Sequence, residues 1–226
     1  MYEANNTVRV NGVCLHYAAV GAGRPVVLVH GNGESHGLFD VEIAQLAEAG
    51  YRVYAPDSRG HGANEPLAEY HYDDMAEDMY QFIRALGLEK PLFYGHSDGG
   101  IIGLLLAIRH PGALSAMAVS GANLSPEGVD PSFQEEFADS GEADDPLIRL
   151  MLTEPHIDPR QLEGVDIPVL VTVGEYDLIL PEETRRIAEH LPQSKLVVVE
   201  GADHGSYIDG SETMGKLLLD FFGGLN

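Results

Sequence analysis

Apolar positions along the chain predict a hairpin followed by strands and helices in alternation. Residues 7–20 alternate between apolar and polar positions as in a hairpin, with Asn11-Gly12 as its turn. Residues 26–30 are apolar almost without interruption, as in a strand buried on both faces. Further strands are predicted at residues 51–55, 115–120, 168–173 and 195–199, with a short one that begins at residue 92. Helical periodicity predicts helices at residues 35–49, 72–86, 101–108, 182–191 and 211–222.

Repeated strand–helix units place the chain in the α/β class. A helix between two strands of one sheet makes the strands parallel, so we expect a mostly parallel central sheet with helices on both faces. We expect residues 1–226 to form a single domain. Residues 122–166 interrupt the alternation and are too many for a plain connection. We predict that they form a short helical lid over the carboxyl ends of the strands, where such sheets carry their sites.

Ser97 stands at a sharp predicted turn between an apolar strand and an apolar helix. Residues 95–99 read Gly-His-Ser-Asp-Gly, the G-x-S-x-G pattern of a nucleophile elbow. In such a turn the serine takes strained backbone angles, and the flanking glycines avoid clashes. The hydroxyl then points toward the N-terminus of the next helix, where amides and the helix dipole favour an anion. An ordinary Gly-Ser turn is the alternative, but the flanking strand and helix favour the nucleophile.

A serine hydroxyl needs a base within hydrogen-bond distance and a carboxylate that orients this base. After such an elbow, the acid and then the histidine follow along the chain. Asp177 and His204 each stand in the loop after one of the last two predicted strands. We therefore predict Ser97 as the nucleophile, His204 as the general base and Asp177 as the orienting acid. Glu175 is the alternative acid, but the shorter carboxylate of Asp177 fits the position better.

Two main-chain amides are needed to hold the oxyanion of a tetrahedral intermediate. We predict that one belongs to Asp98, directly after the nucleophile. The other is assigned to Asn32, in the loop after the strand at residues 26–30. Because Asn32 would donate through its main chain, we expect its side chain to be free to contact substrate. A tight loop without catalytic function is the alternative for residues 30–33, which read His-Gly-Asn-Gly.

Composition limits the expected partners and the compartment. The net charge of −23 argues against nucleic acid and anionic membranes as partners. The chain has one cysteine, Cys14, and its first residues show neither the basic region nor the apolar core of a signal peptide. No apolar run is long enough to span a bilayer. We therefore expect a cytoplasmic protein that acts on a small molecule, and its oligomeric state stays open.

The ordered motifs resemble those of the α/β-hydrolase superfamily over nearly the whole chain. The resemblance is carried by residues 30–33, 57–62, 95–100, 174–177 and 203–205. It implies a serine hydrolase that cleaves small carboxylic esters through an acyl-enzyme, with no metal and no organic cofactor. A lactonase, a thioesterase or a ligand-binding protein on the same scaffold are the alternatives, because this fold serves many functions.

The elbow is also similar to that of valacyclovirase-like hydrolases, which cleave amino-acid esters. In those enzymes the aspartate after the serine is implicated in binding the ammonium group of the substrate. Asp98 holds the matching position in this sequence. The resemblance therefore adds an α-amino ester to the candidate substrates.

Apolar residues of the predicted lid and of the loop after Asp177 are candidates for the wall of the substrate pocket. At helical spacing such residues often pack in a core instead. The candidates are Phe133, Phe137, Leu147, Leu150 and Met151 in the lid, and Leu178 and Ile179 in the loop.

Overall fold

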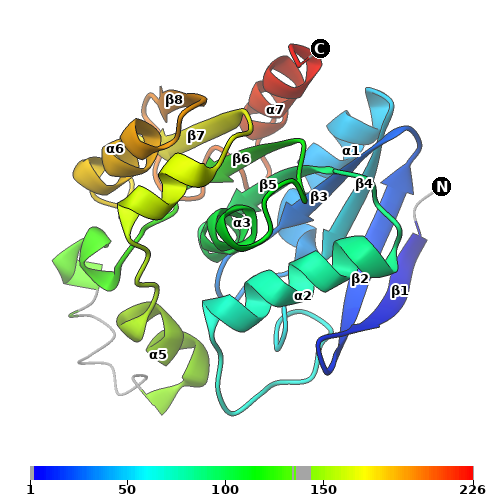
Figure 1. The fold of residues 1–226 in the computed structure, drawn as a ribbon, viewed down its shortest axis with the longest axis horizontal. Coiled ribbons are helices and arrows are strands. Elements are labelled where there is room, and N and C mark those ends of the chain that lie inside the picture. Colours follow the sequence, from blue (N-terminus) through cyan, green and yellow to red (C-terminus); the bar gives the residue numbers. More distant parts are fainter. Residues whose placement is uncertain (1–2, 134, 136–143, 226) are drawn as a thin grey trace.

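The computed structural model describes residues 3–133, 135 and 144–225, and a single sheet runs through its centre (Figure 1). The strands are β1 (Glu3–Val10), β2 (Val13–Gly21), β3 (Arg24–Val29), β4 (Tyr51–Pro56), β5 (Leu92–His96), β6 (Ala116–Ser120), β7 (Val169–Gly174) and β8 (Ser194–Val199). They form one eight-stranded sheet in the order β1-β2-β4-β3-β5-β6-β7-β8. The pairs β1–β2 and β2–β4 are antiparallel, and all other neighbours in this sheet are parallel.

Helices cover both faces of this sheet, so the predicted fold class is confirmed. The α-helices are α1 (Asp40–Glu48), α2 (Tyr72–Ala85), α3 (Asp98–Arg109), α5 (Pro146–Thr153), α6 (Pro181–His190) and α7 (Thr213–Gly223), and short 3-10 helices are η1 (His36–Phe39), η2 (Pro126–Gly128) and η4 (Pro159–Gly164). Val27 and Val29 of β3 pack in one core with α2, α3 and α6. Val26 and Leu28 pack in a second core with α1 and α7. Successive residues of β3 thus serve opposite cores, which explains the uninterrupted apolar sequence.

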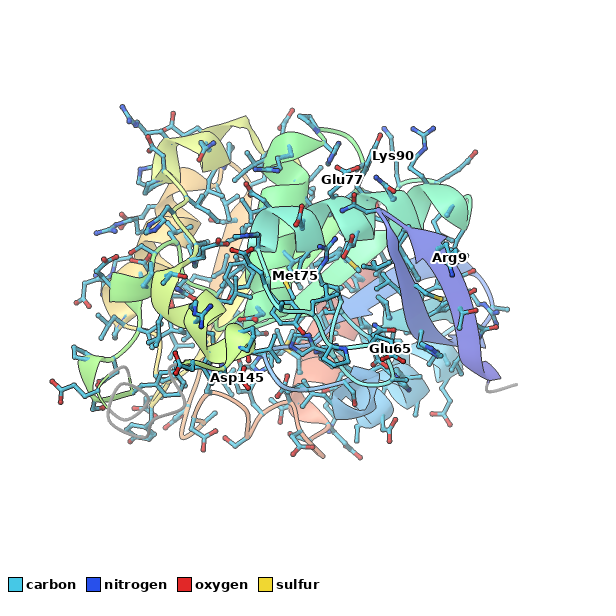
Figure 2. The ribbon with its side chains drawn as sticks, turned by 90° about the horizontal axis from the view of Figure 1, so that it is seen from below. Arg9, Glu65, Met75, Glu77, Lys90 and Asp145 are labelled. Atoms are coloured by element: carbon cyan, nitrogen blue, oxygen red, sulfur yellow. The ribbon has the colours of Figure 1, made fainter. Side chains whose placement is uncertain are left out.

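Local sequence fixes both the hairpin and the largest surface helix. Asn11 and Gly12 have φ angles of 44° and 82°, the left-handed conformations of a tight hairpin turn. In α2 the apolar residues recur at helical spacing, and the helix buries Met75 against α3 while Glu77 is only half-buried (Figure 2). The hairpin and this helix follow the predicted ranges closely.

Two predicted helices differ from the structure at their N-terminal ends. The helix predicted at residues 35–49 begins as the 3-10 turn η1 and becomes α-helical only at Asp40. The Ser35 hydroxyl accepts a hydrogen bond from the amide of Gly37 and thereby caps this turn. The helix predicted at residues 101–108 begins earlier, at Asp98, because the glycines of the elbow belong to its first turn.

The segment predicted as a lid, residues 122–166, contains η2, α5 and η4 among the described residues. Helix α5 begins at Pro146, and the carboxylate of Asp145 caps it by accepting from the amides of Leu147 and Ile148. Phe137, a predicted pocket residue, lies outside the described residues. No helix in the described part of the chain has the length and apolar character to cross a membrane.

Glu42 gives the stability of the fold a marked pH dependence. It lies on α1 with no exposed surface, and no other described residue donates a hydrogen bond to its carboxylate. Burial raises the pKa of Glu42 from 4.5 to about 8. Between these two pH values the folded chain holds a proton that the unfolded chain has lost. The free energy of unfolding therefore falls as the pH rises through this window, by up to about 1.4 kcal/mol per pH unit.

We expect Glu42→Gln to remove this part of the pH dependence, because the neutral amide has the same shape and does not titrate. Urea unfolding of the wild type and the variant at pH 5.0, 6.5 and 8.0 measures the effect. The variant should gain stability relative to the wild type as the pH rises. A constant difference between the two proteins across this range would show that Glu42 titrates normally.

Candidate active site

Ser97 lies on a strained turn between β5 and α3. Its φ and ψ angles are 52° and −116°, a backbone conformation that residues other than glycine rarely adopt. The turn leaves no room for side chains beside it. A Cβ atom on Gly95 would lie 2.0 Å from the carbonyl oxygen of Gly99, and one on Gly99 would lie 1.9 Å from that of Val29. The two flanking glycines are thus required by close backbone approach, as predicted from the pattern.

Asp177 and His204 meet at the carboxyl ends of β7 and β8. Oδ1 of Asp177 accepts a hydrogen bond from Nδ1 of His204 at 2.7 Å and one from the amide of Ile179 at 3.0 Å. Oδ2 accepts from the amide of Gly174 at 3.1 Å. The Asp177 side chain is 1% exposed and fully used as an acceptor, so Nδ1 of the histidine carries the proton. Nε2 is left as the basic nitrogen of the imidazole.

Two neighbours limit the space around the His204 ring. A Cβ atom on Gly121 would lie 2.7 Å from Cε1 of the imidazole, so a glycine is needed there for the ring to fit. The ring of His96 packs against the ring of His204 at a centroid distance of 4.8 Å. Burial lowers the pKa of His96 well below its usual value, which keeps this neighbour uncharged. The alternative acid, Glu175, is exposed and instead accepts from the amide of Gly201.

Ser97 and His204 line one cavity of about 320 Å³, at the edge of the sheet predicted to carry the site. Its apolar wall consists of Val129, Phe133, Ile148, Met151, Leu178 and Ile179. The prediction of Phe133 and Leu178 as pocket residues agrees with this wall. Leu150 was predicted to join them, but it is 2% exposed and belongs to the hydrophobic core that contains residues of α2 and α3. Residues three apart lie on the same face of a helix, so Ile148 and Met151 of α5 both face the cavity while Leu150 faces away from it.

The loop after β3 brings Asn32 beside the elbow. In the described ranges 3–133, 135 and 144–225, the amides of Asn32 and Asp98 donate no hydrogen bond to a protein acceptor. Both residues line the cavity. The side chain of Asn32 is not free, contrary to the prediction. Its Nδ2 donates to Oδ2 of Asp98 at 3.0 Å and to the carbonyl oxygen of Leu147 at 3.2 Å.

The charged side chains around the cavity are acidic. Glu34, Asp98 and Glu154 line it, and no lysine or arginine does so in the part of the chain that the structure describes. Burial raises the pKa of Glu34, although the amide of Gly31 donates to its carboxylate at 2.7 Å. Burial also raises the pKa of Asp98, against the opposing effect of hydrogen bonds from Tyr72 and Asn32.

Glu34, Tyr72 and Glu154 are cavity residues that the sequence analysis missed. Glu34 directly follows the loop motif at residues 30–33, so its position in the sequence could have predicted that it lies at the site. Tyr72 and Glu154 reach the cavity from α2 and from the end of α5, and nothing in the local sequence distinguishes them from packing residues. No cluster of three or more histidine, cysteine, aspartate or glutamate residues that could hold a metal ion occurs among the described residues.

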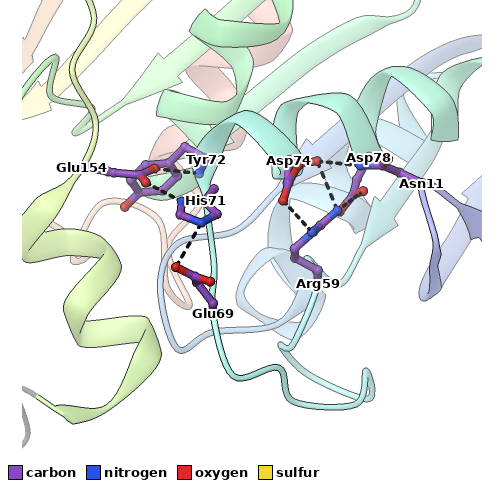
Figure 3. A network of polar contacts seen from close by, with 8 residues as sticks. All are labelled: Asn11, Arg59, Glu69, His71, Tyr72, Asp74, Asp78 and Glu154. Carbon is purple, nitrogen blue, oxygen red and sulfur yellow. Dashed lines mark hydrogen bonds and ion pairs between the residues drawn. The ribbon is translucent and has the colours of Figure 1, made fainter.

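A buried ion pair braces the loop at residues 57–62. Arg59 donates to both carboxylate oxygens of Asp78 at 2.6 Å and also contacts the carboxylate of Asp74 (Figure 3). The His61 ring bonds through Nδ1 to the carbonyl oxygen of Arg59 at 2.9 Å, within the same loop. His30 accepts from the amide of Ser58 at 3.0 Å and ties this loop to β3. These contacts tie the loop at residues 57–62 to α2 and to the end of β3.

Comparisons with known proteins agree with this fold. The family described as alpha/beta hydrolase fold matches residues 24–148, and a family described as TAP-like protein matches residues 151–224. The putative carbamate hydrolase RutD of Caulobacter segnis is 30% identical, over 96% of this chain and 99% of that protein. The serine hydrolase BPHL of Homo sapiens is 28% identical, over 95% of this chain and 84% of that protein.

A solved structure shows the same architecture. The esterase from Thermogutta terrifontis superposes with a TM-score of 0.77 at 22% identity, over 99% of this chain and 98% of that one. The sheet, the elbow and the cavity at its carboxyl edge define a hydrolase-type α/β protein. The chain belongs to the alpha/beta hydrolase fold family.

Proposed function

We propose that the chain is a serine hydrolase that cleaves small carboxylic esters through an acyl-enzyme. The observation that carries the proposal is the 2.7 Å hydrogen bond between Asp177 and His204, at the cavity that the strained Ser97 also lines. The bond fixes the tautomer and the orientation of the imidazole, as a general base requires. A cavity of about 320 Å³ lies at the small end of ligand sites, which favours short acyl groups.

Acylation follows from this arrangement. Oγ of Ser97 attacks the ester carbonyl carbon while Nε2 of His204 takes the hydroxyl proton. The negative charge that develops on the carbonyl oxygen accepts hydrogen bonds from the amides of Asn32 and Asp98. The imidazolium is stabilised by Asp177 and returns the proton to the leaving alkoxide. The alcohol departs and the acyl group stays on Ser97.

Deacylation repeats these steps with water. His204 takes a proton from a water molecule, which attacks the acyl carbon, and the same amides hold the oxyanion. The proton then returns to Oγ of Ser97 as the carboxylic acid leaves. Atoms and charges balance over the cycle with ester and water as the only reactants.

Burst kinetics with p-nitrophenyl acetate tests this proposal against a ligand-binding role. An acyl-enzyme predicts rapid release of one equivalent of p-nitrophenol per site, followed by many turnovers. Esters of acetate, butyrate and octanoate, compared with a lactone, a thioester and an anilide, then define the bond and the acyl length. Saturable binding of these compounds with no turnover of any would contradict an enzymatic role.

The acidic lining favours a second candidate, an ester that carries an ammonium group. The carboxylates of Glu34 and Asp98 line the same cavity, and no described lysine or arginine in the cavity neutralises them. A desolvated ammonium group near two carboxylates gains charge-assisted hydrogen bonds that a neutral acyl group lacks.

A matched pair of substrates tests this candidate. We expect kcat/KM for a valyl ester to exceed that for the 3-methylbutanoyl ester of the same alcohol by about tenfold or more. Glu34→Gln should reduce this preference while the neutral ester is cleaved as before. Equal kcat/KM for the two esters in the wild type would show that the carboxylates do not select the substrate.

A further inference from the structure

The two residues assigned to the oxyanion hole are joined by their own side chains. Nδ2 of Asn32 donates to Oδ2 of Asp98 at 3.0 Å, although the residues are 66 positions apart. Asp98 is only 4% exposed, so the carboxylate end of this bond is shielded from water, while Asn32 is half-buried. A hydrogen bond to a carboxylate is stronger than one between neutral groups. The bond therefore links the loop after β3 directly to the first residue of α3.

Tyr72 holds the other oxygen of the Asp98 carboxylate. Its hydroxyl donates to Oδ1 at 2.6 Å, and the side chain is 1% exposed. Burial and the nearby carboxylate raise the pKa of Tyr72 well above its usual value, so the phenol remains a donor. Both oxygens of Asp98 thus have a partner within the protein, which fixes the orientation of the carboxylate.

Helix α5 contacts the same group of residues at both of its ends. Near its N-terminus, the carbonyl oxygen of Leu147 accepts the second hydrogen bond of the Asn32 amide group at 3.2 Å. At its C-terminus, Glu154 accepts from the main-chain amide of Tyr72 at 3.1 Å and bonds to Nδ1 of His71 at 2.6 Å (Figure 3). The helix that forms part of the cavity wall is therefore tied to the loop after β3 and to the start of α2.

We propose that the side chains of Asn32, Asp98 and Tyr72 form a brace that positions the Asn32 amide for oxyanion binding. The proposal rests on the serine-hydrolase function above and concerns positioning residues of the same site. Asn32 stands between Gly31 and Gly33, and Gly33 has a φ angle of 71°, so the loop has little stiffness of its own. Without the brace the amide would sample positions that no longer meet the oxyanion, and a small displacement of a donor is costly in catalysis.

Three variants test the brace. We expect Tyr72→Phe and Asn32→Ala to lower kcat for p-nitrophenyl acetate by about tenfold or more while KM changes less than twofold. The reason is that the oxyanion develops in the transition state and is absent from the bound substrate. Both variants keep the main-chain amide, and Tyr72→Phe keeps the buried ring. Tyr80→Phe is the matched control on α2, since its hydroxyl bonds to Arg84 away from the cavity. It should leave kcat unchanged.

Asn32→Asp adds a readout that a merely structural role would not move. It places a second carboxylate against Asp98, and the two repel each other at neutral pH but can share a proton when the pH falls. The ratio of variant to wild-type kcat should therefore rise from pH 8 to pH 5. A ratio that is independent of pH would contradict the brace.

Ser97→Ala in the same series distinguishes a failure of the brace from a failure of the proposed serine-hydrolase function. An inactive Ser97→Ala with wild-type kcat in both Tyr72→Phe and Asn32→Ala would overturn the brace and leave the serine mechanism intact. Ester hydrolysis that survives in Ser97→Ala would overturn the serine mechanism itself. A rise in KM at unchanged kcat would make these side chains substrate contacts and would also overturn the brace.

Discussion

Ser97→Ala is expected to lower kcat/KM for p-nitrophenyl acetate by about 10⁴-fold or more. The substitution removes only the attacking oxygen, and what remains comes from binding and from the oxyanion hole. The turn should persist, because the Ser97 amide donates to the carbonyl oxygen of Ser120 at 2.7 Å and close backbone packing surrounds it. Steady-state kinetics, with circular dichroism to verify folding, measures the effect.

Ser115→Ala provides the control for this substitution. Its hydroxyl accepts from Arg24 at 3.0 Å, and neither residue lines the cavity. We expect wild-type activity in this variant. If Ser97→Ala keeps more than a tenth of the wild-type kcat/KM, Ser97 is not the nucleophile.

Asp177→Asn is expected to lower kcat by about 10³- to 10⁴-fold with little change in the fold. The carboxylate accepts three hydrogen bonds, from His204, Ile179 and Gly174. An amide has one accepting oxygen, so its NH₂ group would face a donor, either a main-chain amide or the imidazole. The imidazole would then lose its orientation or take the wrong tautomer, and Nε2 would no longer serve as the base.

Glu175→Gln is the matched control for the acid, since it makes the same chemical change two residues earlier. Glu175 is exposed, and among the described residues its carboxylate bonds only to the amide of Gly201. Its substitution should leave kcat within about twofold of the wild type. The opposite outcome, an active Asp177→Asn and an inactive Glu175→Gln, would reassign the orienting acid. Initial rates on one ester decide between the two.

The sequence predicted those features that short-range rules control. Apolar runs such as residues 26–30 predict buried strands because each residue serves one of two cores. The elbow is predictable because Gly95 and Gly99 are needed for close backbone approach. The meeting of Asp177 and His204 follows from their places after adjacent parallel strands, whose carboxyl ends share one edge of the sheet.

Features that depend on contacts between distant residues were not predictable. Leu150 was assigned to the pocket because its residue type fits, but the phase of α5 decides which of its residues face the cavity. The bond between Asn32 and Asp98 joins two loops, and no local pattern indicates it. The same holds for Tyr72, whose hydroxyl acts from the start of α2 although its sequence neighbours suggest only a packing role.

The central claim is tested most directly by labelling the wild-type protein with a fluorophosphonate and mapping the adduct by peptide mass. The account predicts one adduct per chain, located on Ser97, and no adduct over the same time in His204→Ala, where the base is missing. An adduct on any other residue, or labelling of His204→Ala at the wild-type rate, would contradict it.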